Sequence, residues 1–176
     1  MTTETLTAAV QAALIHTPLG VLEVAWSDEG LCLLRFSGGE PGAVVRARYP
    51  EAVWGAARPE WVDELARRLA LHLAGEPQSF AELPLDLSGC TPFQREVYAV
   101  CRQLPAGEVA TYGTLAEHLG RGASSARAIG GAMAKNPLLL IVPCHRVVGS
   151  GGLTGFNAPG GLETKRTLLE LEGWQG

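Results

Sequence analysis

The hydrophobic pattern of this chain changes character at Gly89-Cys90-Thr91-Pro92, and this change constrains the fold more than any other feature. Before this point, short apolar runs alternate with turn signals, as in a three-stranded antiparallel meander. After it, apolar residues recur mainly at helical spacing. The sequence therefore predicts an α+β protein, with a small N-terminal α/β domain at 1–88 and a mainly helical C-terminal domain at 89–176. The predicted strands are at 12–16, 21–26 and 31–36.

Helical patterns support this division. One covers 60–73, and Thr91 as N-cap with Pro92 at the first helical position starts the next. Glycines at 120–122 join two short helices in a tight turn, an arrangement shared by DNA-binding helix-turn-helix motifs and plain αα-hairpins. The apolar run at 138–142 is too short for a helix and predicts a buried strand. The other predicted helices are at 112–119, 124–135 and 162–172.

Composition narrows the class of protein. Of 176 residues, 47% are hydrophobic and 18% charged, which excludes a disordered, highly charged chain. No apolar run approaches the ~20 residues that span a bilayer, and Met1-Thr2-Thr3-Glu4 lacks the basic stretch of a secretory signal. The cysteines lie far apart, which predicts reduced thiols in a cytoplasmic protein with no membrane partner. They are Cys32, Cys90, Cys101 and Cys144.

Charge is distributed unevenly. The net charge is −4, which on its own argues against a nucleic-acid partner. Residues 1–94 hold twelve acidic and six basic side chains, whereas residues 121–166 hold six basic side chains and one acidic one. We therefore expect one face of the C-terminal half to accept a polyanion.

Cys144 is the cysteine placed most like a nucleophile. It follows the predicted strand, has a histidine and an arginine beside it, and precedes a glycine-rich loop. Cationic neighbours lower the pKa of a thiol, and the thiolate is the reactive form. Position alone fits equally well a small buried apolar residue, as we expect for the other three cysteines.

A base is also available in the sequence. Neighbouring side chains on an extended chain point to opposite faces, so His145 needs a bend at Pro143 or a bridging water to reach Cys144. Glu172, at the end of the last helix where the macrodipole disfavours an anion, is a candidate to orient His145. No Cys/His set has metal-ligand spacing, so we expect no metal. Ordinary structural or surface histidines are expected at His16, His72 and His118.

Several motifs together resemble the O6-alkylguanine-DNA alkyltransferase family. The match is colinear through nearly all of 89–173, and the Pro-Cys-His-Arg block is its most specific part. The N-terminal half fits the family's small α/β domain only by pattern. The matching motifs are Pro92-Phe93-Gln94, Gly107 to Tyr112, Arg127-Ala128-Ile129-Gly130-Gly131-Ala132-Met133, Asn136-Pro137, Pro143-Cys144-His145-Arg146-Val147, Lys165 and Glu172-Gly173.

The resemblance implies direct DNA repair, in which the alkyl group of O6-alkylguanine, and also of O4-alkylthymine, passes irreversibly to Cys144. His145 would deprotonate the thiol through a water, and Glu172 would orient His145. Asn136 would support the active-site turns, and Tyr112 would donate its phenol proton to guanine N3. Each molecule would act once, as a monomer and without a cofactor.

The resemblance also implies binding in the DNA minor groove with the damaged base rotated into a pocket. Arg127 would take the place of the extruded base, and small residues would let the helix enter the groove. A core tyrosine and solvated helix charges are the ordinary interpretations of Tyr112, Arg127 and Lys135. The implied DNA-binding residues are Arg127, Ala128, Gly130, Gly131, Lys135 and Arg121. The implied pocket residues are Met133, Val147, Gly155, Phe156, Asn157 and Lys165.

Two departures from the family pattern lie near this site. The turn at 120–125 is one residue longer than is common and lacks the usual proline, and Asn157-Ala158-Pro159 lengthens the loop after Phe156. Two other functions stay open. One is a non-catalytic, alkyltransferase-like lesion-binding protein, although those relatives replace the cysteine that is intact here. The other is a cysteine hydrolase, which the adjacent Cys-His order and the lack of an oxyanion motif disfavour.

Overall fold

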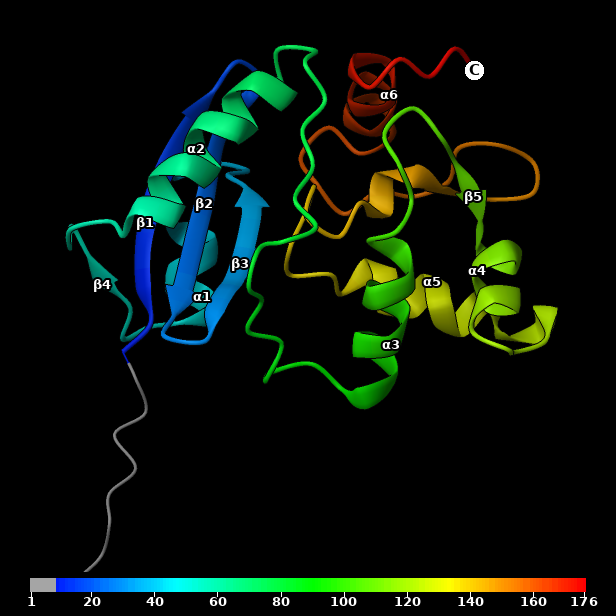
Figure 1. Cartoon of the computed structure of the whole chain (residues 1–176), viewed down its shortest axis with the longest axis horizontal. Helices are drawn as coiled ribbons and strands as arrows, with labels where there is room; N and C mark the ends of the chain where they lie inside the picture. The colour runs from blue at the N-terminus through cyan, green and yellow to red at the C-terminus, as the bar shows by residue number, and fades with distance from the viewer. Residues whose placement is uncertain (1–8) are drawn as a thin grey trace, which may run out of the picture.

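The computed structural model describes residues 9–176, and Figure 1 shows a sheet domain beside a helical domain. The sheet domain comes first in the chain. Its elements are β1 (Gln11–Thr17), β2 (Gly20–Ser27), β3 (Gly30–Phe36), α1 (Ala43–Arg48), β4 (Val53–Trp54) and α2 (Glu60–His72). The helical domain contains α3 (Pro92–Cys101), β5 (Ala110–Thr111), α4 (Tyr112–His118), η1 (Ala123–Ser125), α5 (Ala126–Ala134), η2 (Cys144–Arg146), β6 (Val147–Val148) and α6 (Leu162–Leu171).

The predicted meander is confirmed. β1, β2 and β3 form an antiparallel sheet in the order β3-β2-β1-β4, in which the short β4 adds parallel to β1 at the edge. Because side chains alternate along a strand, Leu22 and Val24 pack with α2 whereas Ala25 packs with Val45 of α1 on the other face. Figure 1 shows α2 in front of the sheet and α1 behind it. The sequence pattern did not predict α1 or β4.

Local signals set the start of α3 as predicted. The Thr91 hydroxyl accepts the Gln94 backbone N–H at 3.2 Å, and the Gln94 side chain accepts the Thr91 backbone N–H at 2.9 Å. This reciprocal capping satisfies two backbone donors that a helix start leaves free. The helices predicted at 112–119, 124–135 and 162–172 are also present, each with bounds shifted by one or two residues.

The strand predicted at 138–142 is wrong. This segment forms consecutive turns, and Leu140 has a positive φ of 72°. It touches the sheet at one place, where the Leu34 N–H donates to Pro137 O and the Leu139 N–H donates to Leu34 O, both at 2.9 Å. All five residues are buried between the two domains. The apolar run therefore correctly indicated that this segment is buried, but a buried segment can form turns as well as a strand.

The two domains share one hydrophobic core. Leu22 and Leu34 of the sheet belong to the same buried cluster as Val97 of α3 and Ile129 of α5. Arg102, just after α3, donates to the carbonyl oxygens of Phe80 and Ala81 at 3.0 and 2.9 Å. The domains are thus packed and hydrogen-bonded to each other. Throughout residues 9–176, the helices are too short or too polar to cross a membrane.

Candidate active site

A pocket of about 370 Å³ brings together residues from four parts of the helical domain. Tyr112 comes from the first turn of α4, Met133 from α5, Cys144 from η2 and Phe156 from the glycine-rich loop. Most of the predicted pocket residues therefore meet in one place. The full lining is Tyr112, Gly130, Met133, Ala134, Cys144, Gly155, Phe156 and Asn157.

Val147 and Lys165 lie behind this pocket instead of lining it, which corrects their predicted position. Both are fully buried. The Lys165 ammonium donates to Val147 O at 2.6 Å and to Thr154 O at 2.8 Å, so it ties α6 to the base of the glycine-rich loop. Burial lowers the pKa of Lys165 to about 8, although Cys144 and Cys101 act in the opposite direction.

The Cys144 thiol faces the pocket from a confined position. Its residue is 7% exposed, and its sulfur accepts a hydrogen bond from Asn136 Nδ2 at 3.3 Å. Burial raises the pKa of the Cys144 thiol above its usual value, and the Asn136 hydrogen bond with the nearby Lys165 and Arg35 charges partly offsets this. The thiol is therefore protonated before reaction, and a base is needed to remove the proton.

Asn136 also organises the turn that carries Cys144. Its Nδ2 donates to Val142 O at 2.9 Å, and its Oδ1 accepts the Leu138 N–H at the same distance. The side chain is buried, and all its polar groups are paired. Asn136 thus closes the segment 136–144 on itself.

His145 does not line the pocket. Cys144 and His145 lie on a short 3₁₀-helix that begins directly after Pro143, so the chain bends at this proline instead of staying extended. His145 is 0% exposed, and its Nε2 lies 2.8 Å from Glu172 Oε1. Its Nδ1 is buried with no partner among residues 9–176.

The protonation of this pair follows from its surroundings. Burial of Glu172 would raise its pKa, but hydrogen bonds from His145, His72 and Arg146 hold the pKa of this carboxyl well below its usual 4.5. Burial lowers the pKa of His145 below its usual 6.5, although Glu172 acts against this. A carboxylate only accepts hydrogen bonds, so neutral His145 carries its proton on Nε2 and keeps a lone pair on Nδ1.

Glu172 lies at the C-cap of α6, where carbonyl groups make an anion unfavourable. Arg146 compensates with two hydrogen bonds, from Nε to Oε2 at 2.9 Å and from Nη2 to Oε1 at 2.8 Å. Its Nη1 also donates to Leu104 O. A Cβ at Gly107 would lie 2.9 Å from Glu172 O, so glycine lets the turn after α3 approach this helix end.

Two residues of the sheet domain reach the site, and the sequence reasoning missed both. His72, expected to be an ordinary histidine without a partner, has its Nε2 2.9 Å from Glu172 Oε1. Arg35 of β3 donates to Asn136 O at 2.9 Å and also to Asn157 O. These contacts join residues about a hundred positions apart, so no local pattern could have indicated them.

The predicted DNA-binding residues form only part of one surface. Arg127, Ala128 and Gly131 are exposed along α5, and Lys135, which is also exposed, is the C-cap residue of this helix. Gly130 instead lies against Tyr112 at the pocket. In the described part of the chain Arg127 has no ion pair. Arg121 is paired with Glu96 at 2.9 Å and lies 5.0 Å from the centre of the Phe93 ring.

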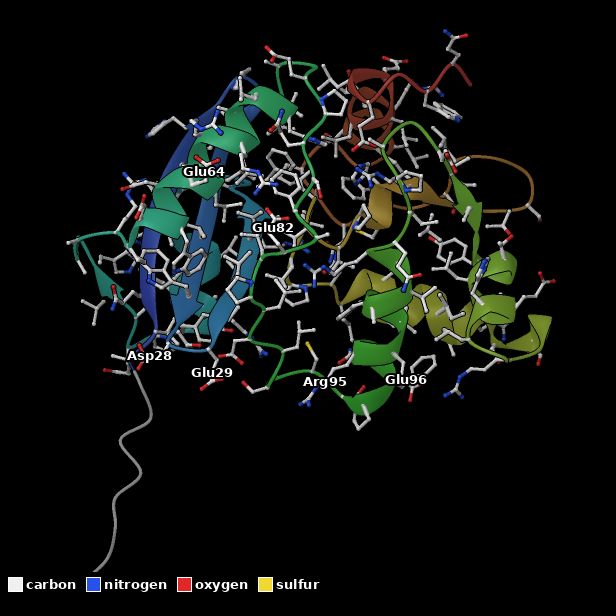
Figure 2. The ribbon with its side chains drawn as sticks, viewed as in Figure 1. Asp28, Glu29, Glu64, Glu82, Arg95 and Glu96 are labelled. Carbon is white, nitrogen blue, oxygen red and sulfur yellow. The ribbon has the colours of Figure 1, made fainter. Side chains whose placement is uncertain are left out.

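The basic surface is smaller than the charge count suggested. Arg146 and Lys165 are buried, which leaves the face around α5 with fewer free cations. Figure 2 labels the acidic residues Asp28, Glu29, Glu64 and Glu82 on the sheet domain and the segment that follows it, and Glu64 and Glu82 are paired there with Arg67 and Arg68. Arg127 is the one charged side chain within α5 itself.

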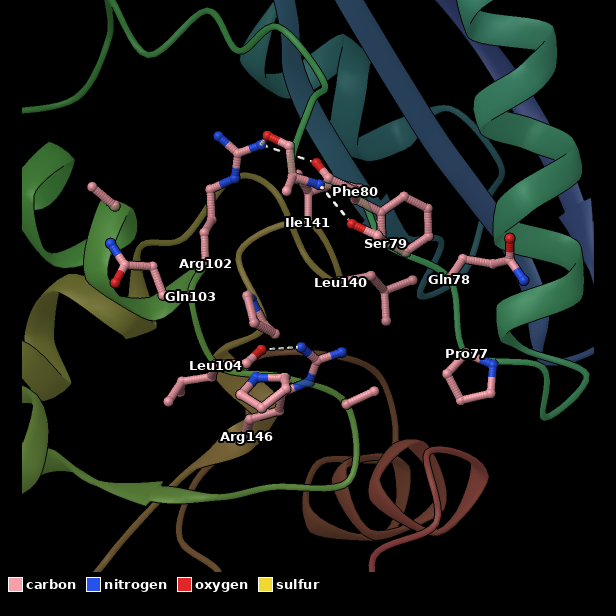
Figure 3. A pocket seen from close by; sticks show the side chains of 15 residues that line it. Pro77, Gln78, Ser79, Phe80, Arg102, Gln103, Leu104, Leu140, Ile141 and Arg146 are labelled. Atoms are coloured by element: carbon pink, nitrogen blue, oxygen red, sulfur yellow. Dashed lines mark hydrogen bonds between the residues drawn. The ribbon is translucent and has the colours of Figure 1, made fainter.

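A larger cavity of about 670 Å³ borders the other side of the Cys144 turn (Figure 3). It lies between the segment 77–81 and the turn after α3, and Pro143 and Arg146 form part of its wall. Figure 3 shows Arg146 bonded to Leu104 there. Cys144 does not line this cavity, so the smaller pocket is the candidate reaction site. Within residues 9–176, no three Cys, His, Asp or Glu side chains are grouped to hold a metal ion.

Comparison with known proteins identifies the family. Two family models match: the ribonuclease-like domain of 6-O-methylguanine DNA methyltransferase over residues 10–87, and its DNA-binding domain over residues 92–174. A methylated-DNA–protein-cysteine methyltransferase of Methanosarcina acetivorans is 38% identical, covering 92% of this chain and 97% of that protein.

Solved structures give the same result. The O6-methylguanine methyltransferase of Mycobacterium tuberculosis is similar at a TM-score of 0.76 and 36% identity, covering 93% of this chain and 92% of that one. The same protein in complex with DNA is similar at a TM-score of 0.70 and 34% identity, with the same coverage. The chain therefore belongs to the O6-methylguanine DNA methyltransferase family, with both of its domains.

Proposed function

We propose that this protein repairs double-stranded DNA by moving the alkyl group of O6-alkylguanine to the sulfur of Cys144, once per molecule. The observation that carries the proposal is that a thiol and a phenol, Cys144 and Tyr112, line the same pocket. Displacement at a methyl carbon needs a soft anionic nucleophile on one side and a protonated leaving group on the other. These two residues can supply both.

Activation of the thiol uses His145. Its bare, buried Nδ1 is the free base of the site, and a bridging water would carry the Cys144 proton to it. Glu172, hydrogen-bonded to Nε2, stabilises the imidazolium that forms. The Asn136 N–H and the Lys165 charge favour the thiolate.

The transfer step then balances. The thiolate electron pair forms the S–C bond, the C–O6 bond breaks, and its electrons remain on the guanine, which takes a proton at N3 from Tyr112. The proton held by His145 replaces the one that Tyr112 has lost, through solvent. The product is a thioether, which acid–base groups do not hydrolyse, so the protein is consumed. The methyl donor is the DNA, and no cofactor takes part.

The DNA surface we propose is the exposed face of α5, approached along the minor groove. Extruding a base costs a few kcal/mol, and Arg127 would fill the space left in the stack. A Cβ at Gly131 would meet nothing within 4 Å, so packing within the protein does not require glycine there. Close approach of the narrow minor groove of DNA to this helix does favour a residue without a side chain at position 131. Lys135 would contact phosphate, whereas Arg121 would first have to leave Glu96.

The test is to mix the protein with a duplex that contains one O6-methylguanine, weigh the intact protein and map the modified peptide. We expect one added methyl group on Cys144 and none in Cys144→Ala. Tight binding without a mass change would favour a lesion-binding protein, and turnover of an ester or peptide would favour a hydrolase. The intact Cys144 and the identity to methyltransferases both support transfer. A second duplex containing O4-methylthymine tests the breadth of the pocket.

The remaining expectations belong to the same proposal. Domain limits of 1–88 and 89–176 are supported by the family matches, which end at residue 87 and resume at residue 92. A cytoplasmic location is supported by the four cysteines, all of them free, and we propose that the protein acts there as a monomer. Gel filtration of the purified protein, with and without duplex DNA, tests the monomer.

A further inference from the structure

His72 joins the sheet domain to the proposed base. It is the last residue of α2, and it is 1% exposed. Its Nε2 lies 2.9 Å from Oε1 of Glu172, one hundred positions later in the chain. The same oxygen accepts the hydrogen bond of His145 Nε2 at 2.8 Å. Two imidazoles from different domains therefore share one carboxylate oxygen.

The tautomer of His72 is set by the backbone. The Gln78 N–H donates to His72 Nδ1 at 3.0 Å, so this nitrogen is an acceptor and carries no proton. The proton of the neutral ring is then on Nε2, which donates to Glu172. His72 is thus a neutral donor that points at the carboxylate, locked by a main-chain group six residues later.

The other side chains that donate to Glu172 come from the short helix η2, which also carries the nucleophile. Arg146 and His145 both belong to η2, next to Cys144. Among residues 9–176, His72 is the one side-chain donor to this carboxylate from outside that segment. Bonds to Leu104 O and from Asn136 hold η2 within the helical domain, and His72 is the bond that fixes the carboxylate against the end of α2.

We propose that His72 is a positioning residue for methyl transfer: its Nε2–H holds Glu172 where the carboxylate keeps His145 oriented, with Nδ1 free to receive the Cys144 proton. This inference rests on the proposed function and extends it by giving the sheet domain a part in activating the nucleophile. His72 touches neither the pocket nor the DNA face, so its effect must pass through Glu172.

Two variants distinguish the hydrogen bond from His72 to Glu172 from the one that His72 accepts from the Gln78 N–H. His72→Gln keeps an amide donor near the position of Nε2 but has no acceptor in place of Nδ1. His72→Asn keeps an acceptor for the Gln78 N–H but cannot reach Glu172. We expect His72→Asn to transfer methyl about tenfold more slowly than the unaltered protein, because a small misplacement of a catalytic group is costly. We expect His72→Gln to recover most of the rate, and both variants to bind duplex DNA as tightly as the unaltered protein.

A control variant separates positioning from stability. Leu69→Ala removes a fully buried side chain one turn earlier on α2 that makes none of the hydrogen bonds to Glu172. It should lower the unfolding temperature without slowing transfer by the folded molecules. Three results would overturn the proposal. They are equal slowing of methyl transfer in Leu69→Ala and His72→Asn, full transfer activity in His72→Asn, and a transfer rate in His72→Gln as low as that of His72→Asn. If His72→Asn does not fold, the position of the His72 proton in the unaltered protein still tests the proposed hydrogen bond to Glu172.

Two further readouts do not depend on methyl transfer. Nitrogen-15 NMR of labelled histidine should find the proton of His72 on Nε2 in the unaltered protein, and a proton on Nδ1 would overturn the proposal. The second readout is the rate at which iodoacetamide modifies Cys144, measured by peptide mapping at a series of pH values. The pH profile of this rate should move to higher pH in His72→Asn but not in Leu69→Ala. If the unaltered protein fails to transfer methyl, the proposed function falls, while these two readouts still test the hydrogen bond itself.

Discussion

The side-chain nitrogen of Asn136 lies 3.3 Å from the sulfur of Cys144 and 2.9 Å from the carbonyl oxygen of Val142. One amide group therefore both closes the turn before the nucleophile and donates to the nucleophile. A donor aimed at sulfur favours the thiolate over the thiol. Folding of the turn and reactivity of the thiol thus depend on the same side chain.

Asn136→Asp tests this dual role, because it keeps the acceptor for the Leu138 N–H and removes both donated hydrogen bonds. We expect the apparent pKa of Cys144 to rise by about one pH unit or more, since lost donation and added negative charge both disfavour the thiolate. Iodoacetamide modification of Cys144 across pH measures it. The free energy of unfolding should fall by about 1–3 kcal/mol, as for a buried carbonyl left unpaired. An unchanged pH profile would exclude the sulfur contact.

Tyr112→Phe tests the proton donor. The ring remains, so packing against Gly130 and the pocket wall should persist. Removing a general acid typically slows a reaction about 10²-fold or more. We expect single-turnover methyl transfer to slow by that order while the Kd for methylated duplex changes little. Equal losses in rate and affinity would indicate a tyrosine with only a structural role.

Arg127→Ala tests base extrusion. The side chain is exposed on α5, so the fold and unfolding temperature should be unchanged. Repair of O6-methylguanine within a duplex should slow, whereas methyl transfer from the free base, which needs no extrusion, should proceed at the unaltered rate. Lys135→Ala is the matched control, since it removes an exposed charge from the C-cap of α5. It should weaken binding to all duplexes with a smaller salt dependence.

Acid should destabilise the protein in two stages. Burial lowers the pKa of His145 in the native protein. Below about pH 6.5 the histidine is therefore protonated in the unfolded chain but still neutral in the native protein, and the free energy of unfolding falls. Below about pH 4.5 the same applies to Glu172, because its hydrogen bonds depress its carboxyl pKa in the native state. Urea unfolding between about pH 7 and pH 4 measures both stages. His145→Gln should remove most of the first stage. A free energy of unfolding that does not decline between about pH 7 and pH 4 would contradict the prediction.

Local patterns predicted much of the fold. The meander, α2 and α3 follow from alternation, helical spacing and capping residues, all of which act within a few positions. α1 has six residues and β4 has two, too few for a period to stand out. The segment 138–142 was misassigned because a buried apolar run has the same composition whether it extends or turns.

The site was predictable only in part. Its chemical groups, Cys144, His145, Asn136 and Tyr112, belong to specific motifs, and Glu172 was conspicuous as an anion at a helix end. The environment was not predictable, because it depends on contacts between domains. Arg146 and Lys165 were counted as surface charge and proved to be buried. His72 and Glu172 meet only once the C-terminal ends of α2 and α6 are brought together in the folded protein.

The bond between His72 and Glu172 also limits how this molecule can be recombined. A chimera that joins the sheet domain of one relative to the DNA-binding domain of another would keep every motif around the thiol and yet lose this contact, unless the donor domain supplies a histidine, or another N–H of equal reach, at the end of α2. Residues 72 and 172 should therefore be exchanged together.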